Sequence, residues 1–180
     1  MSGYAFASEV AWRLLSIDYR KTLDDIMCSP KFAEEFDRLA MLYGPEDITS
    51  LEYRRAAFSI RKRTKPARLA AQKELDRWSR KSLNRNAIDD CLTEEYECPG
   101  IFVLCSDESG IYAGESENIR EHLELFRENP NWQRLNPDSI FVERADKSFT
   151  EKCAMKSALV WRSSPLLNCR LWVDDSELPK

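Results

Sequence analysis

Two short apolar runs separated by a turn constrain the fold of this chain more than any other feature of its sequence. The first run, Gly100 to Cys105, follows a proline, and the second, Ile111 to Gly114, ends in glycine. The residues between them, Asp107 to Gly110, have the polar and glycine-containing composition of a tight turn. The pattern predicts a β-hairpin.

The rest of the second half alternates between helical and strand patterns. Helices are predicted from about residue 117 to 128 and from 149 to 162, and a third strand over 139–144. A further short strand over 170–173, at the end of the chain, is left open and is not counted in the sheet. We therefore expect residues 89–180 to form a domain with a small, mainly antiparallel three-stranded sheet flanked by helices. The fold class expected for the whole chain is α+β.

The first half, residues 1–88, reads as a helical region. Ser29 and Pro30 predict the start of a helix that Gly44 ends, because proline favours the first turn and glycine the end. A capping box at Thr49–Glu52 opens the next helix. Pro66 is expected to interrupt or restart that helix. Residues 82–90 are polar and are expected to be a linker between the two domains.

Charge is distributed very unevenly along the chain. Between Arg54 and Arg85 there are twelve lysines or arginines and two acids, so this block carries +10, while the whole chain carries −4 and the remainder −14. A block of one sign favours contact with a polyanion such as nucleic acid over simple solvation of a helical face, which mixed charges achieve equally well. The candidate phosphate-binding residues in it are Arg54, Arg55, Arg61, Lys62, Arg63, Lys65 and Arg68.

The order hairpin, helix, strand, helix in the second half resembles the GIY-YIG nuclease superfamily. The first motif of that family corresponds to Pro99–Phe102 and the second to Ile111–Ser116. Asn118 and Ile119 resemble the opening of the catalytic helix. The closing motif is matched by Leu159 and Val160, then Pro165 and Asn168. The resemblance spans about seventy residues, from Cys98 to Asn168.

The resemblance implies a degenerate nuclease site. In the family two tyrosines position or activate water, an arginine stabilises the phosphate, and a glutamate binds one divalent metal. Here the first tyrosine position is Phe102, and Tyr112 keeps the second. The arginine position holds His122 and the glutamate position holds Lys156, whose ammonium has no lone pair for a metal. Asn168 is retained.

Three functions remain open from the sequence. The favoured one is a pseudoenzyme that binds nucleic acid, with DNA preferred, through the basic block and through Lys156 and Asn168. An alternative is an active endonuclease with a rearranged site built from Tyr112, His122 and Glu151, which alone would require Mg²⁺ or Mn²⁺. The third is a regulatory or adaptor subunit whose acidic half or apolar helical face binds a protein partner.

Simpler structural roles stand beside these functional interpretations. Tyr112 would equally pack on the sheet, His122 would be an isolated histidine, and Asn168 would satisfy backbone groups after Pro165. Apart from Mg²⁺ in the nuclease alternative, no cofactor or metal site is expected, since the six cysteines form no close Cys-x-x-Cys pair.

The location expected from the sequence is cytoplasmic. No apolar run approaches the roughly 20 residues of a membrane helix, so no membrane association is expected. The first residues lack the pattern of a secretory signal, and the cysteines are expected to be reduced thiols.

Overall fold

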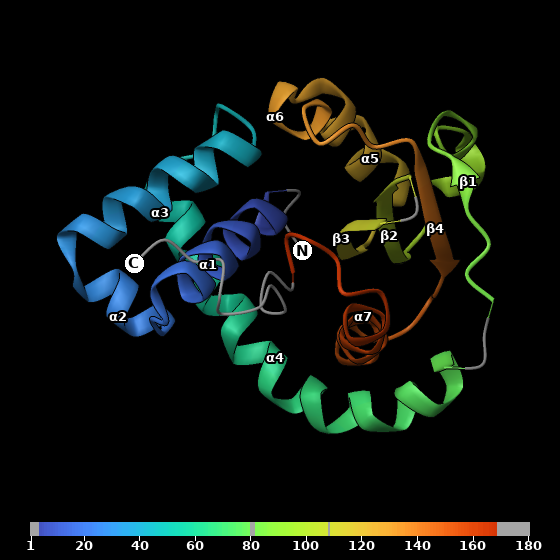
Figure 1. Cartoon of the computed structure of the whole chain (residues 1–180), viewed down its shortest axis with the longest axis horizontal. Helices are drawn as coiled ribbons and strands as arrows, with labels where there is room; N and C mark the ends of the chain where they lie inside the picture. Colours follow the sequence, from blue (N-terminus) through green and yellow to red (C-terminus); the bar gives the residue numbers. More distant parts are fainter. Residues whose placement is uncertain (1–3, 80–81, 108, 169–180) are drawn as a thin grey trace.

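A computed structural model describes residues 4–79, 82–107 and 109–168, with backbone only for residues 64–73, 75–79, 149 and 161. It contains helices and strands in one α+β arrangement (Figure 1). In chain order the elements are α1 (Ala5–Tyr19), α2 (Leu23–Cys28), α3 (Pro30–Tyr43), α4 (Ser50–Ser79), β1 (Asn86–Ala87), the short 3₁₀ helices η1 (Asp89–Cys91) and η2 (Glu94–Tyr96), β2 (Gly100–Ser106), β3 (Ser109–Ser116), α5 (Ile119–Glu128), α6 (Pro130–Gln133), β4 (Ser139–Arg144) and α7 (Phe149–Ser163).

The sheet is antiparallel throughout, with the strand order β1-β4-β2-β3. The predicted hairpin is confirmed, since β2 pairs with β3 from Gly100 opposite Ser116 to Ser106 opposite Ser109. The predicted strand over 139–144 is β4, which lies on the other side of β2. The strand predicted over 170–173 lies outside the described residues.

The prediction of three strands was wrong, because the sheet has a fourth. Asn86 and Ala87 form β1, opposite Ile140 and Ser139 of β4, within the segment predicted as a linker. A strand of two exposed residues is too short to show the alternation that identifies strands in a sequence. Its formation depends on the edge that β4 offers rather than on its own residues.

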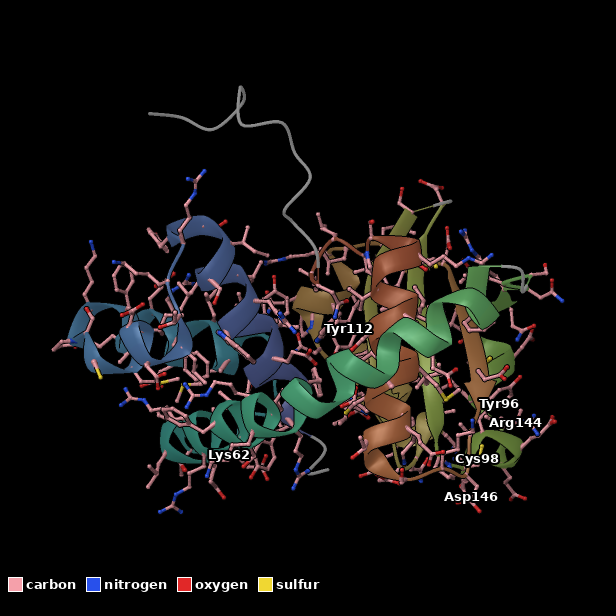
Figure 2. The ribbon with its side chains drawn as sticks, turned by 90° about the horizontal axis from the view of Figure 1, so that it is seen from below. Lys62, Tyr96, Cys98, Tyr112, Arg144 and Asp146 are labelled. Carbon is pink, nitrogen blue, oxygen red and sulfur yellow. The ribbon has the colours of Figure 1, made fainter. Side chains whose placement is uncertain are left out.

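Residues of β2 alternate between the two faces of the sheet, as a strand requires. Ile101, Val103 and Cys105 pack with residues of α7. Phe102 and Leu104 belong to the larger core, which includes residues of α1, α5 and α6. Helix α4 packs on α7, and Figure 2 shows it crossing α7 on the side away from the sheet.

Local signals set the ends of the N-terminal helices. The predicted helix before Gly44 is α3, with Pro30 in its first turn and the Gly44 N–H donating to the Ala40 carbonyl. The predicted capping box is also present. The Thr49 N–H donates to Glu52 Oε2 over 3.0 Å, and the Glu52 N–H donates to Thr49 Oγ1 over 3.4 Å.

The expectation that Pro66 interrupts the following helix was wrong. Helix α4 runs without a break from Ser50 to Ser79. A proline inside a helix removes one backbone hydrogen bond and crowds the preceding turn, but packing against a neighbouring element offsets that cost. The neighbour here is α7, against which α4 packs.

The helical half and the sheet half are joined by a continuous core. Phe6 and Val10 of α1 belong to the same buried cluster as Tyr112 and Trp132. A hydrogen bond also connects the two halves, since the Trp132 indole N–H donates to the Tyr43 carbonyl over 3.0 Å. Within the described residues, no helix combines the length and apolar character needed to cross a membrane.

Candidate functional site

A buried ion cluster lies where the sequence resemblance places the catalytic cleft. The Lys156 ammonium of α7 is 2.8 Å from Glu9 Oε2 of α1 and also pairs with Glu115 Oε2 of β3. All three side chains are at most 6% exposed. Arg13 lies 3.8 Å from the other oxygen of Glu9. Lys156, which the resemblance led us to expect at a metal-binding position, therefore lies between two acidic side chains.

The charges in this cluster shift one another's pKa values. Burial alone would lower the pKa of Lys156, but the Glu115 and Glu9 carboxylates raise it well above its ordinary value. Burial opposes ionisation of Glu9, yet attraction from Lys156 and Arg13 keeps the pKa of Glu9 below its ordinary value. Burial raises the pKa of Glu115, and Lys156 offsets this only in part. Of the two carboxyl groups, Glu9 is thus the one whose ionised form the cluster favours more strongly.

Tyr112 lies where the two halves of the molecule meet (Figure 2). Its hydroxyl donates to Glu9 Oε2 over 3.4 Å, and its ring centroid is 6.1 Å from that of Phe102. Burial and the Glu9 carboxylate raise the pKa of Tyr112 well above its ordinary value. A Cβ on Gly114 would come within 2.5 Å of the Phe102 ring, so glycine is required for this close packing.

His122 packs among aromatic rings. Its ring centroid is 4.8 Å from Phe6, 5.1 Å from Phe126 and 5.5 Å from Phe102. Its Nδ1 lies 3.1 Å from Ser116 Oγ, and Nε2 has no hydrogen-bond partner among the described residues. Burial and the positive charge of Lys156 lower the pKa of His122 to about 3. The imidazole is therefore neutral over the physiological pH range.

The neutrality of His122 gives a direct test, because the chain has one histidine. We expect its imidazole proton signals in NMR spectra to stay constant between pH 8 and pH 5. Since the folded-state pKa is depressed, stability is complete above the unfolded value of 6.5 and is lost as the pH falls towards about 3. A His122→Gln variant should lose less stability over this range. A titration midpoint near pH 6.5 in the folded protein would contradict this assignment.

Asn168 serves the backbone of the edge strand. Its Oδ1 accepts from the Ala113 N–H over 2.6 Å, and its Nδ2 donates to the Ala113 carbonyl over 3.0 Å. Leu166 and Leu167 also donate from their backbone N–H groups to carbonyls of β3, at Gly110 and Ile111. The side chain of Asn168 thus continues a row of strand-like bonds along β3.

Glu151 lies outside the buried cluster. It is exposed in the first turn of α7, where its Oε2 accepts from the Ser148 hydroxyl over 2.6 Å and from the Ser148 N–H over 3.1 Å. These bonds lower the pKa of Glu151 and explain the residue as a helix cap. Among the described residues, no group of three or more histidine, cysteine or acidic side chains is arranged to hold a metal ion.

A small cavity of about 80 Å³ adjoins the cluster. Tyr112 and His122 both line it, together with Glu9, Glu115 and Phe6. The structure therefore brings together two of the three residues of the nuclease alternative. Phe6 and Glu9, both on α1, form part of the wall of this cavity.

The candidate phosphate-binding residues on α4 differ in their surroundings. Arg54 forms two hydrogen bonds with Asp37, at 2.9 and 2.6 Å, and Arg61 pairs with Asp24. Arg55, Lys62 and Arg63 are exposed. Lys65 and Arg68 have side chains outside the described part of the structure. Figure 2 shows Lys62 on the part of α4 beside the N-terminal helices.

We compared the chain with known protein families, characterised proteins and solved structures. No protein-family model, characterised protein or solved structure matches this chain. The site is therefore interpreted from its own geometry.

Sequence reasoning did not identify the two carboxylates that face Lys156. Glu115 stands inside the second motif, and Glu9 lies three residues after Phe6 and four before Arg13. The available signal was an acidic residue on the apolar face of a helix, since Phe6, Glu9 and Arg13 share one side of α1. The pairing itself joins positions 147 residues apart.

Proposed function

We propose that this protein is a non-catalytic nucleic-acid-binding protein built on a degenerate GIY-YIG scaffold. The observation that carries the proposal is the exposure of Arg55, Lys62 and Arg63 on α4, within the segment that carries +10. Relative to Arg55, helical geometry places Lys62 at about −20° and Arg63 at about +80°, so the three residues span about 100° and share one side of the helix. Such a face contacts backbone phosphates without reading sequence.

The arrangement of strands and helices supports the scaffold assignment. The resemblance implied a hairpin, a helix, a third strand and a second helix, and the elements β2, β3, α5, β4 and α7 follow in that order. The positions matched to catalytic residues are linked by contacts, since the Phe102 ring lies beside Tyr112 and His122, and Tyr112 and Lys156 both bond to Glu9. DNA remains the favoured partner within this proposal.

The state of the site supports a binding function over hydrolysis. Phosphodiester hydrolysis of the family type needs a carboxylate that is free to hold a metal. Glu9 and Glu115 are committed to Lys156, and Glu151 caps α7. Lys156 is 4% exposed and already paired, so the proposed phosphate contacts rest on α4 and not on Lys156.

Removal of the exposed cations should weaken nucleic-acid binding. In a titration of fluorescent duplex DNA, we expect the Arg55→Ala/Lys62→Ala/Arg63→Ala variant to bind at least about tenfold more weakly than the wild type. The slope of log affinity against log salt should fall by about two to three units, because each phosphate contact contributes about 0.9. Parallel titrations with single-stranded DNA and with RNA establish the preferred nucleic acid.

A matched control removes the same charge elsewhere. Lys21, Lys31 and Arg127 are also exposed, and their triple alanine variant should bind within about twofold of the wild type. Salt-insensitive binding, or equal losses in both variants, would refute the proposed interface. Cleavage in the presence of Mg²⁺ or Mn²⁺ that disappears in Tyr112→Phe or Glu151→Ala would instead establish the nuclease alternative.

A further inference from the structure

A groove of about 440 Å³ lies between the end of α3 and the end of α5, and none of its described lining residues belongs to α4. Met41 and Leu42 of α3 line one wall, and Leu125 of α5 lines the other with Phe6. Met41 is 45% exposed, so its side chain is accessible from the groove. Figure 1 shows the end of α3 facing α6 at this place.

The two walls are fixed to each other by hydrogen bonds. The Leu42 carbonyl accepts from Asn131 Nδ2 over 2.8 Å and from Asn129 Nδ2 over 3.2 Å. The neighbouring Tyr43 carbonyl accepts from the Trp132 indole N–H. These bonds occupy backbone acceptors that a helix end otherwise leaves to solvent. The groove is therefore formed before any partner arrives, which lowers the entropic cost of binding.

The charge of the groove is negative. Glu46 and Glu128 are its only charged lining residues in the described part of the chain, and both are exposed. Glu128 is the last residue of α5, where the helix dipole adds negative potential, and Glu46 follows the end of α3 by three residues. Arg134 contacts Asn131 Oδ1 nearby but does not line the groove. Such a surface repels nucleic acid and attracts cations.

We propose that this groove binds a peptide segment of a partner protein that combines an aliphatic or aromatic anchor with lysine or arginine. The anchor would lie on Met41 and Leu125, whose flexible side chains suit apolar residues of different shape. The basic side chains would reach Glu46 and Glu128. Long basic side chains fit because their methylene stems pack on apolar surface while their charges stay at the rim. The site is separate from the proposed nucleic-acid interface on α4.

The first test identifies which peptide sequences bind the protein, starting from a library of random sequence. A random peptide library displayed on phage is selected against the full-length wild-type protein, and the enriched peptides are labelled for fluorescence anisotropy. We expect enriched sequences to combine leucine, isoleucine or phenylalanine with lysine or arginine. Failure to enrich any sequence, or enrichment of sequences without basic residues, would overturn the proposal.

Groove variants then locate the bound peptide. We expect Glu46→Lys/Glu128→Lys and, separately, Met41→Asp to weaken the selected peptide at least about tenfold, since both the charge and the anchor contribute. These residues are exposed, so circular dichroism should show an unchanged fold. The control Glu34→Lys/Glu94→Lys makes the same change at exposed acids outside the groove and should bind within about twofold of the wild type. Equal binding by all variants would refute the groove as the site.

Analytical ultracentrifugation separates a foreign partner from a second copy of this chain. The wild-type protein should remain monomeric at the concentrations used for peptide binding. Self-association that the Glu46→Lys/Glu128→Lys variant abolishes would identify a second copy of this chain as the occupant and would overturn the assignment to a partner protein.

Discussion

Replacing Lys156 by methionine is expected to lower the free energy of unfolding by about 3–5 kcal/mol, because the change leaves buried carboxylates without their cation. The ammonium pairs with Glu9 and Glu115, and all three groups are almost entirely buried. Methionine fills a similar volume, so the loss reports the charge and not a cavity. Urea denaturation followed by circular dichroism measures the difference.

The pH dependence of this loss identifies its origin. Without Lys156, burial and mutual repulsion would raise the pKa values of Glu9 and Glu115 above their unfolded value of 4.5. A raised folded-state pKa gives stability that is present below the unfolded pKa and lost as the pH rises through the folded one. The variant should therefore be closest to the wild type near pH 4 and furthest from it near pH 8.

Two comparisons separate the buried cluster from ordinary lysine packing. Lys152 lies one turn earlier on α7, also has a buried side chain, and pairs with Glu117, which is 55% exposed. Lys152→Met should cost no more than about 1 kcal/mol, since Glu117 stays hydrated. Adding Glu9→Gln and Glu115→Gln to Lys156→Met should recover most of the loss, because no buried charge then remains unpaired. A single Lys156→Met variant as stable as the wild type would contradict the ion cluster.

Replacing Phe6 by alanine is expected to lower the free energy of unfolding by about 3–5 kcal/mol, because the change removes buried aromatic packing. The Phe6 ring lies 5.1 Å from Phe126 and 5.9 Å from Trp132, and the side chain is 4% exposed. Because Phe6 belongs to α1 and the other rings to α5 and α6, its loss should weaken the packing between the helical half and the sheet half. Chemical denaturation gives the energy, and hydrogen exchange should show faster opening of α1 and α5 together.

Leu51→Ala is a suitable control for the Phe6 change. Leu51 also lies on a helix of the first half but is 55% exposed, so its truncation should change stability by less than about 0.5 kcal/mol. If Phe6→Ala cost no more than Leu51→Ala, helix α1 would not anchor the sheet half. If hydrogen exchange changed only in α1, the two halves would open independently.

Local interactions made much of the secondary structure predictable from the sequence. The hairpin of β2 and β3 follows from two apolar runs around a turn, and the start of α4 follows from the reciprocal bonds of Thr49 and Glu52. In both cases the stabilising contacts join residues close in the chain, so their pattern is visible in the sequence itself. Long-range pairing explains β1, and packing on α7 explains the passage of α4 through Pro66.

The candidate site divides in the same way between sequence and tertiary structure. The sequence alone determined which chemical groups this half of the chain carries, including the histidine at 122 and the lysine at 156. Only the tertiary structure decided that Lys156 faces Glu9 from the other end of the chain. The physical reason is that a charge is buried only with a partner, and the partner is chosen by how whole helices pack and not by neighbouring residues.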